Sequence, residues 1–277
     1  MNEIKLVNIA CGDVYIKNNN WINLDIISNN KYVTKINLLN KLPFLDNSVD
    51  AIYCSHFLEH IPIDKVSNFL HECFRILKKG GVFRLVLPDF ESLSKEYLKQ
   101  VKLKNKVKSK IVLLTIIDQC VRKKPGGLLN EFYKDLLTKK KVKKSEIKYL
   151  TFLNGVDFET KSKNKSKRTF NSYIQKIYSL IKIIFLNIWL RFIMMLLPKT
   201  FKEQNISLAR IGELHHWIWD YYSLSDYLVK AGFSKTIRQK YNMTISKVSK
   251  LYIFDQDRKK KMSRGIESMY IESLKND

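Results

Sequence analysis

Short apolar runs and polar turns alternate along the first ninety residues of the chain. Five runs have the length and composition of β-strands, and they span residues 5–10, 21–26, 32–36, 51–55 and 82–87. Residues 64–77 repeat apolar side chains at helical spacing, and we expect Asp64 to cap the N-terminus of that helix. Strands that alternate with helices favour a doubly wound α/β architecture with a parallel sheet.

The same pattern returns near the C-terminus after a long interruption. Residues 223–231 have helical spacing and end at Gly232, while residues 235–242 and 267–273 alternate like strands. We expect these two strands to form an antiparallel hairpin at the edge of the sheet. The chain is thereby divided into three parts. Residues 1–98 form the first half of the α/β domain, residues 99–205 form a large, basic and mainly helical insertion, and residues 206–277 complete the domain.

Positive charge is concentrated in the insertion. The whole chain has a net charge of +24, and residues 95–205 contain 27 Lys and Arg against 8 Asp and Glu. Such a surplus favours an anionic partner, which is a membrane surface, a nucleic acid or a phosphate-bearing substrate. The alternative is a lysine bias spread over solvated faces. Few aromatic residues lie among the lysines of residues 99–170, which makes nucleic acid the less favoured partner.

Residues 174–197 form the most apolar helical segment of the insertion. Apolar side chains recur along one face, and three cations within the segment argue against a membrane-spanning helix. One interpretation is a helix that lies in a membrane interface, bound to anionic lipid. The other is a helix packed on the α/β core or on a second subunit. The sequence leaves the oligomeric state open.

Cysteine usage and the N-terminus indicate a reducing compartment. The four cysteines form no C-x-x-C pair, and residues 1–20 lack the apolar core of a signal peptide. We therefore expect a cytoplasmic protein, with the insertion offering a route to peripheral association at the inner face of a membrane.

Gly12 and Asp25 follow the first two predicted strands. Ligands bind at the carboxyl ends of the strands in doubly wound sheets, and a glycine there lets the backbone approach a ligand closely. A carboxylate at the end of the second strand accepts the hydroxyls of a ribose in dinucleotide folds. We therefore expect Asp25 to hold a ribose; the alternative is that it caps backbone amides of its own loop.

His56, Glu59 and His60 have the spacing H-x-x-E-H, which is also the pattern of inverted zincins. In zincins the pattern lies within a long helix and is completed by a third ligand downstream. Here it follows a strand directly and Pro62 comes soon after, which is incompatible with a long helix. We therefore predict no metal at this motif.

Together these segments resemble the class I, S-adenosylmethionine (SAM)-dependent methyltransferases of the type 11 group. The branch most similar to the chain is often associated with bacterial surface-polysaccharide biosynthesis. The resemblance covers roughly residues 4–98 and 207–273. It is carried by NIACG (8–12), WINLD (21–25), LPF (42–44), DNS (46–48), YCSH (53–56), LEH (58–60), EC (72–73), RILK (75–78), GG (80–81), LPD (87–89), HHW (215–217), Asp220 and AGF (231–233).

The resemblance implies a Rossmann-like methyltransferase sheet, SAM as cofactor, and a cofactor site. In that site Ala10, Cys11 and Gly12 line the methionine and ribose portion, and Asp25 holds the ribose. The adenine is flanked by Ile26, Asn37 and Leu38, and Ser55 and His56 lie beneath the methionine arm. Ala10 stands where the family usually has glycine, which matters if this residue must adopt a positive φ.

Transfer of a methyl group to a hydroxyl requires an aligned acceptor and a general base, usually histidine. The candidates are His60, His215 and His216, with His216 preferred because residues 212–220 precede the late helix and can extend over the cofactor. We expect the acceptor to be a hydroxyl of a saccharide or lipid-linked glycan. The alternatives are methylation of RNA or another anionic polymer, or a non-catalytic scaffold with the same fold.

Overall fold

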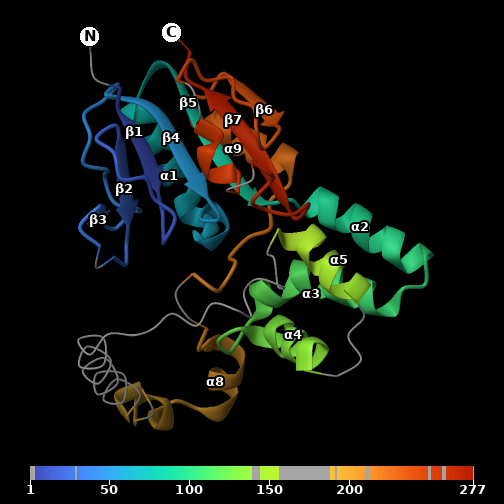
Figure 1. The fold of residues 1–277 in the computed structure, drawn as a ribbon. Coiled ribbons are helices and arrows are strands. Elements are labelled where there is room, and N and C mark those ends of the chain that lie inside the picture. Colours follow the sequence, from blue (N-terminus) through green and yellow to red (C-terminus); the bar gives the residue numbers. More distant parts are fainter. Residues whose placement is uncertain are drawn as a thin grey trace, which may run out of the picture.

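The structure is a computed structural model that describes most of the chain. The described residues are 4–28, 30–138, 144–155, 188–190, 192–209, 212–248, 251–257 and 260–276. Figure 1 shows a twisted sheet with the helical insertion lying beyond the carboxyl ends of its first strands.

A seven-stranded sheet has the order β3-β2-β1-β4-β5-β7-β6. Strands β1 to β5 are parallel, β7 runs antiparallel to β5, and β6 runs antiparallel to β7. The predicted parallel sheet and antiparallel edge hairpin are both confirmed, with β7 inserted between β5 and the edge strand β6. The strands are β1 (Leu6–Ile9), β2 (Trp21–Asp25), β3 (Val33–Lys35), β4 (Val49–Ser55), β5 (Leu77–Pro88), β6 (Lys235–Gln239) and β7 (Ser268–Leu274).

One face of the sheet is covered by α1 (Ile63–Ile76) and α9 (Tyr221–Lys230), which enclose the main hydrophobic core. Helix α1 begins one residue before the predicted helix. Its N-cap residue is Pro62, which makes no side-chain cap, so the prediction that Asp64 is the N-cap was wrong. Asp220 caps α9 by accepting hydrogen bonds from the backbone N–H groups of the first turn.

The described residues between β1 and β2 form no helix. The opposite face of the sheet is covered instead by the chain between β6 and β7. The 3₁₀-helix η2 (Leu251–Asp255) packs there against apolar side chains of the sheet. Arg84 of β5 is fully buried and donates hydrogen bonds to Asp255 (2.7 Å) and Glu272 (2.6 Å). This ion-pair network fixes the covering segment on the sheet.

The insertion has a hydrophobic core of its own, built mainly from α2, α3 and α5. Helix α2 runs across the predicted boundary at residue 98 and connects the sheet to this core. The helices are α2 (Phe90–Lys102), α3 (Lys106–Val121), α4 (Gly127–Thr138) and α5 (Lys144–Asn154), and α8 (Lys199–Asn205) lies further out (Figure 1).

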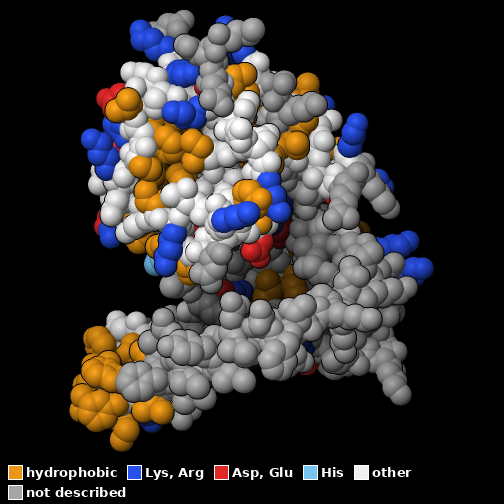
Figure 2. Space-filling view, turned by 60° about the vertical axis from the view of Figure 1, so that its left-hand side comes forward, with side chains coloured by type: hydrophobic (Ala, Val, Ile, Leu, Met, Phe, Trp, Pro, Cys, Tyr) orange, Lys and Arg blue, Asp and Glu red, His pale blue; other side chains and the backbone are white. Residues whose placement is uncertain are grey.

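Residues 188–201 expose many large apolar side chains. Figure 2 shows them gathered at the outer tip of the molecule, and they are Ile188, Trp189, Leu190, Phe192, Ile193, Met195, Leu196 and Phe201. Most of the predicted apolar helix at residues 174–197 lies outside the described residues. Within the described part of the chain, no helix is long and apolar enough to cross a bilayer.

Candidate active site

The turn after β1 has left-handed backbone at two positions. Ala10 has φ 53° and Gly12 has φ 52°. A Cβ atom built on Gly12 would meet no other atom within 4 Å, so this glycine borders open space. The Cys11 N–H donates to the Leu24 carbonyl of β2 (3.1 Å), which holds the turn against the neighbouring strand.

Asp25, the last residue of β2, faces this turn. Its Oδ2 accepts a hydrogen bond from the Gly12 N–H (2.9 Å), and its Oδ1 accepts one from the Ile27 N–H (2.9 Å). A carboxylate has about four acceptor positions, so about two remain for a ligand. Asp25 can therefore cap the two backbone amides and still bind a ribose.

Two cavities of about 550 and 470 Å³ meet at this turn, and Ala10, Gly12 and His56 line both. Sites of this size are typical for small ligands and cofactors. The first cavity extends past Cys11 and Ser55, the second past Asp25. All nine residues predicted to bind the cofactor line one or both cavities, and they are Ala10, Cys11, Gly12, Asp25, Ile26, Asn37, Leu38, Ser55 and His56.

Cys11 is a buried thiol in the wall of the first cavity. Burial, with a smaller effect of the Asp25 carboxylate, raises the pKa of Cys11 to about 12. The side chain is therefore an uncharged thiol at physiological pH, which suits a packing role better than a nucleophilic one.

His56 follows β4 and also has a left-handed backbone, with φ 51°. Its Nε2 lies 3.1 Å from Ser268 Oγ of β7, and its Nδ1 lies 3.2 Å from Glu59 Oε1. Non-glycine residues in this conformation are concentrated at functional sites. The two strained positions, His56 and Ala10, end adjacent strands and border the same cavities.

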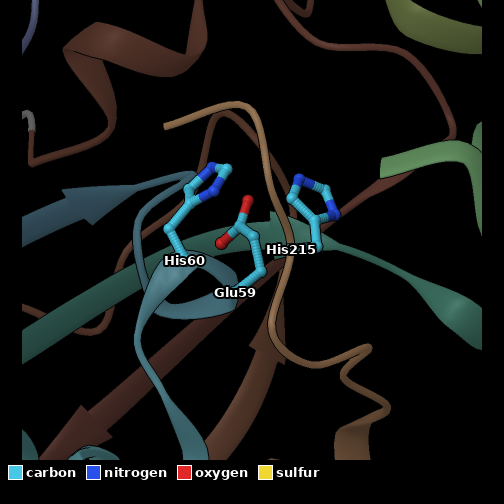
Figure 3. Close-up of side chains that lie close together, drawn as sticks. All are labelled: Glu59, His60 and His215. Carbon is cyan, nitrogen blue, oxygen red and sulfur yellow. The ribbon is translucent and has the colours of Figure 1, made fainter. Parts of the chain in front are cut away.

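Glu59 and His60 belong to the 3₁₀-helix η1 (Leu58–His60) and meet His215 from the segment before α9. Figure 3 shows the Glu59 carboxylate between the two imidazole rings. One ligand atom from each of the three residues lies within 4.8 Å of the others. The H-x-x-E-H motif thus contributes Glu59 and His60 to a cluster whose third member is distant in sequence.

Burial shapes the protonation of this cluster. Burial lowers the pKa of His215 to about 4, so its ring is neutral at physiological pH. Burial also acts to raise the pKa of the Glu59 carboxyl. The close approach of His56, with His60 and His215 nearby, outweighs burial and lowers the Glu59 pKa, which keeps the carboxylate ionised.

The candidate bases are placed differently. His60 lines the second cavity, together with the predicted adenine-binding residues. His215 is buried beside it, with ring centroids 4.7 Å apart. His216 is exposed and lines neither cavity, and its backbone N–H donates to the Glu59 carbonyl (2.7 Å).

Several cavity residues were not found by sequence reasoning. Gln256, Ser263 and Arg264 line the first cavity from the segment that covers the second face of the sheet. No local motif marks them, because they reach the site only through the packing of that segment. Arg264 adds a cationic side chain to the first cavity, which Gly12 also lines.

Comparisons with known proteins agree with the architecture of this site. Residues 24–85 match the family model described as a methyltransferase domain. No curated protein matches the sequence. Among solved structures, the chain is similar to a SAM-dependent methyltransferase from Thermotoga maritima, described as a possible histamine N-methyltransferase. Identity to that protein is 15%, the TM-score is 0.41, and the match covers 100% of this chain and 84% of the other. A SAM-dependent methyltransferase from Archaeoglobus fulgidus is 21% identical over 35% of this chain and 52% of its own, with a TM-score of 0.28.

Residues 24–85 thus match a methyltransferase domain and lie within a Rossmann-like sheet, and this match implies SAM as the cofactor. This protein class is supported by the domain match and by the strand order of the chain itself, because the similarities to solved structures are distant.

Proposed function

We propose that the protein transfers the methyl group of SAM to a hydroxyl of a saccharide or lipid-linked glycan. The observation that carries this proposal is the pair of joined cavities at the carboxyl ends of β1, β2 and β4, where Gly12 and Asp25 meet. A cofactor in this place would extend through both cavities, with its reactive end near the residues that line both, Ala10, Gly12 and His56.

The residues of the cavities fit the three portions of the cofactor. Asp25 has free acceptor positions for the ribose hydroxyls, and Ile26, Leu38 and Ile61 offer an apolar surface for the adenine. Arg264 can pair with the carboxylate of the methionine arm in the first cavity. When bound, SAM supplies an electrophilic methyl group on its sulfonium. The protein's main task is then to hold an acceptor in line with that group.

Of the two histidines predicted to be catalytic, we assign the action on the acceptor to His60. Its Nδ1 lies 2.8 Å from the Leu214 carbonyl, which can only accept a hydrogen bond. Nδ1 is therefore the protonated nitrogen, and Nε2 has a lone pair that can act on a hydroxyl proton. His216 has no comparable place beside the cavities.

Two features support a glycan acceptor at a membrane surface. Trp217 lies next to the cluster in the chain and is 45% exposed, which makes its ring available to stack on a sugar. The exposed apolar side chains of residues 188–201 belong to the basic insertion, and such a combination suits association with anionic lipid. We therefore place the protein at the cytoplasmic face of a membrane, where lipid-linked glycans are assembled.

The test is incubation of the protein with methyl-labelled SAM and separated cell-envelope fractions. Label is expected in a glycan or glycolipid fraction, sensitive to Asp25→Ala and insensitive to Asp226→Ala, an exposed position on α9. Label in RNA would reject the glycan acceptor. Absence of SAM binding in calorimetry would reject methyl transfer and favour a non-catalytic scaffold.

A further inference from the structure

We propose that Glu59, His60 and His215 bind a divalent transition-metal cation, and their ligand set points to Zn²⁺. The three side chains come from η1 and from the segment before α9, and their ligand atoms converge on one point between them (Figure 3). Recognition of the cofactor by Gly12 and Asp25 makes no use of this cluster.

The strongest observation is the state of the Glu59 carboxylate. Its side chain is 1% exposed, and neither carboxylate oxygen has a hydrogen-bond partner among the described residues. The contact with His56 Nδ1 at 3.2 Å is close but lacks hydrogen-bond geometry. Burial of a carboxylate is unfavourable unless it is paired or coordinates a metal. Besides the ion-pair contact with His56, a bound cation would give the two carboxylate oxygens the ligand contacts that they lack among the described residues.

Each imidazole of the cluster is held by a hydrogen bond through one ring nitrogen, and His60 has the arrangement that is usual for a metal ligand. A ligating histidine typically uses its other ring nitrogen to bond a carbonyl, a carboxylate or another polar group, and this bond fixes the ring. His60 Nδ1 is held by the Leu214 carbonyl at 2.8 Å, which leaves Nε2 free for a metal. His215 Nε2 lies 2.9 Å from the side-chain amide nitrogen of Gln119 on α3, a donor, so a metal on Nδ1 would require the Gln119 amide to turn and present its oxygen to the Nε2 proton.

The three ligand groups indicate which metal ion the site would bind. Two imidazoles and one carboxylate are the ligands of catalytic zinc sites, which keep a further position open. Mg²⁺ prefers oxygen ligands, so it fits this set poorly. One ligand atom from each of the three residues lies within 4.8 Å of the others, which places them around one possible ion position.

The place of the ion gives it a role that rests on the proposed function. His60 is both a member of the cluster and a wall of the second cavity, which also contains His56 of the first cavity, so the ion would lie beside the cofactor site. A hydroxyl bound to Zn²⁺ loses its proton more readily than a free one. His60 would then be a ligand of the ion and not the base, and the hydroxyl proton would pass to solvent.

The experiment uses the full chain, freed of metal by a chelator, and titrates it with Zn²⁺ and separately with Co²⁺. Calorimetry is expected to give one equivalent of Zn²⁺ per chain, and Co²⁺ is expected to give visible absorption bands. His215→Ala and Glu59→Gln should each weaken Zn²⁺ binding at least tenfold. His71→Ala, an exposed histidine of α1, is the matched control and should bind as the wild type does.

Thermal unfolding gives a second readout that does not depend on activity. Zn²⁺ should raise the Tm of the wild type and of His71→Ala, because a ligand that binds the native state stabilises it. It should leave the Tm of His215→Ala unchanged. Circular dichroism establishes that each variant is folded, and His60→Ala replaces any variant that is not.

The outcomes separate this inference from the proposed function. Zn²⁺ binding that is absent, or unaffected by both His215→Ala and Glu59→Gln, overturns the cation site even if SAM binding and methyl transfer persist. One equivalent of Zn²⁺ at this cluster without any SAM binding leaves the cation site standing and rejects methyl transfer.

Discussion

Replacement of Ala10 by glycine tests the turn on which the cofactor site depends. Ala10 has φ 53°, a left-handed conformation that costs an L-residue with a Cβ atom about 1–2 kcal/mol. Glycine removes that strain but loses about 0.4–1 kcal/mol through the greater freedom of the unfolded chain. The net expectation for Ala10→Gly is a gain of about 0.5–1 kcal/mol in the free energy of unfolding.

The assay is equilibrium unfolding in urea, with calorimetry as a second method. The urea midpoint should rise at an unchanged slope, and the Tm should rise by about 1–4 °C for a chain of this size. SAM affinity, measured on the same samples, should be equal to that of the wild type or tighter, because the change leaves the Asp25 hydrogen bonds in place.

Ala231→Gly is the matched control. Ala231 ends α9 with φ −77°, where alanine is unstrained, and its methyl group is buried, so the same chemical change should destabilise by roughly 1–2 kcal/mol through the freer backbone and the lost burial. A gain in the free energy of unfolding for Ala10→Gly, together with a loss for Ala231→Gly, would support the effect of the positive φ at Ala10. If Ala10→Gly lowers stability as Ala231→Gly does, the strain that we ascribe to the first turn is wrong.

Three further predictions concern the cofactor clamp, the sheet and the cavity thiol. Asp25→Ala should weaken SAM binding at least tenfold in calorimetry, because it removes the acceptor for both the Gly12 N–H and the ribose. Arg84→Met should lower the free energy of unfolding by about 3–5 kcal/mol, since it leaves two buried carboxylates unpaired. Cys11, with its pKa raised from 9.0 to about 12, should be alkylated at pH 8.5 on the order of a thousandfold more slowly than an ordinary thiol.

Each of these has a result that would count against it. Unchanged affinity in Asp25→Ala would remove this carboxylate from the cofactor site. A loss below about 1 kcal/mol in Arg84→Met would show that the buried ion pairs contribute little, as exposed pairs do. Peptide mapping should find Cys11 unlabelled in the native protein and labelled in urea; rapid native labelling would contradict the raised pKa.

Several features of this protein could be predicted because they depend on neighbours in the chain. The spacing of apolar residues indicated α1 to within one residue at each end, and alternation indicated the strands of the sheet. The nine predicted cofactor residues line the cavities because, in a parallel sheet, the residues after each strand all reach the same edge.

Other features depend on contacts between distant segments, and no local pattern reports them. The positive φ of Ala10 belongs to a turn that is hydrogen-bonded to β2, and a contact between two strands cannot be predicted from the residues of the turn alone. Arg264 enters the first cavity because its segment takes the place of a helix after β1. The H-x-x-E-H motif was predicted to bind no metal because it does not lie within a long helix, and the approach of His215 to Glu59 and His60 depends on packing between distant segments.

The chain's own periodicity thus determined which segments are strands and helices, and which of their ends carry ligand-binding residues. The tertiary structure alone decided that His215 meets Glu59 across more than 150 residues, and that His60 rather than His216 borders the cavity. The physical reason is that secondary structure follows from local spacing, whereas a buried cluster exists only once separate segments have packed and excluded water from between them.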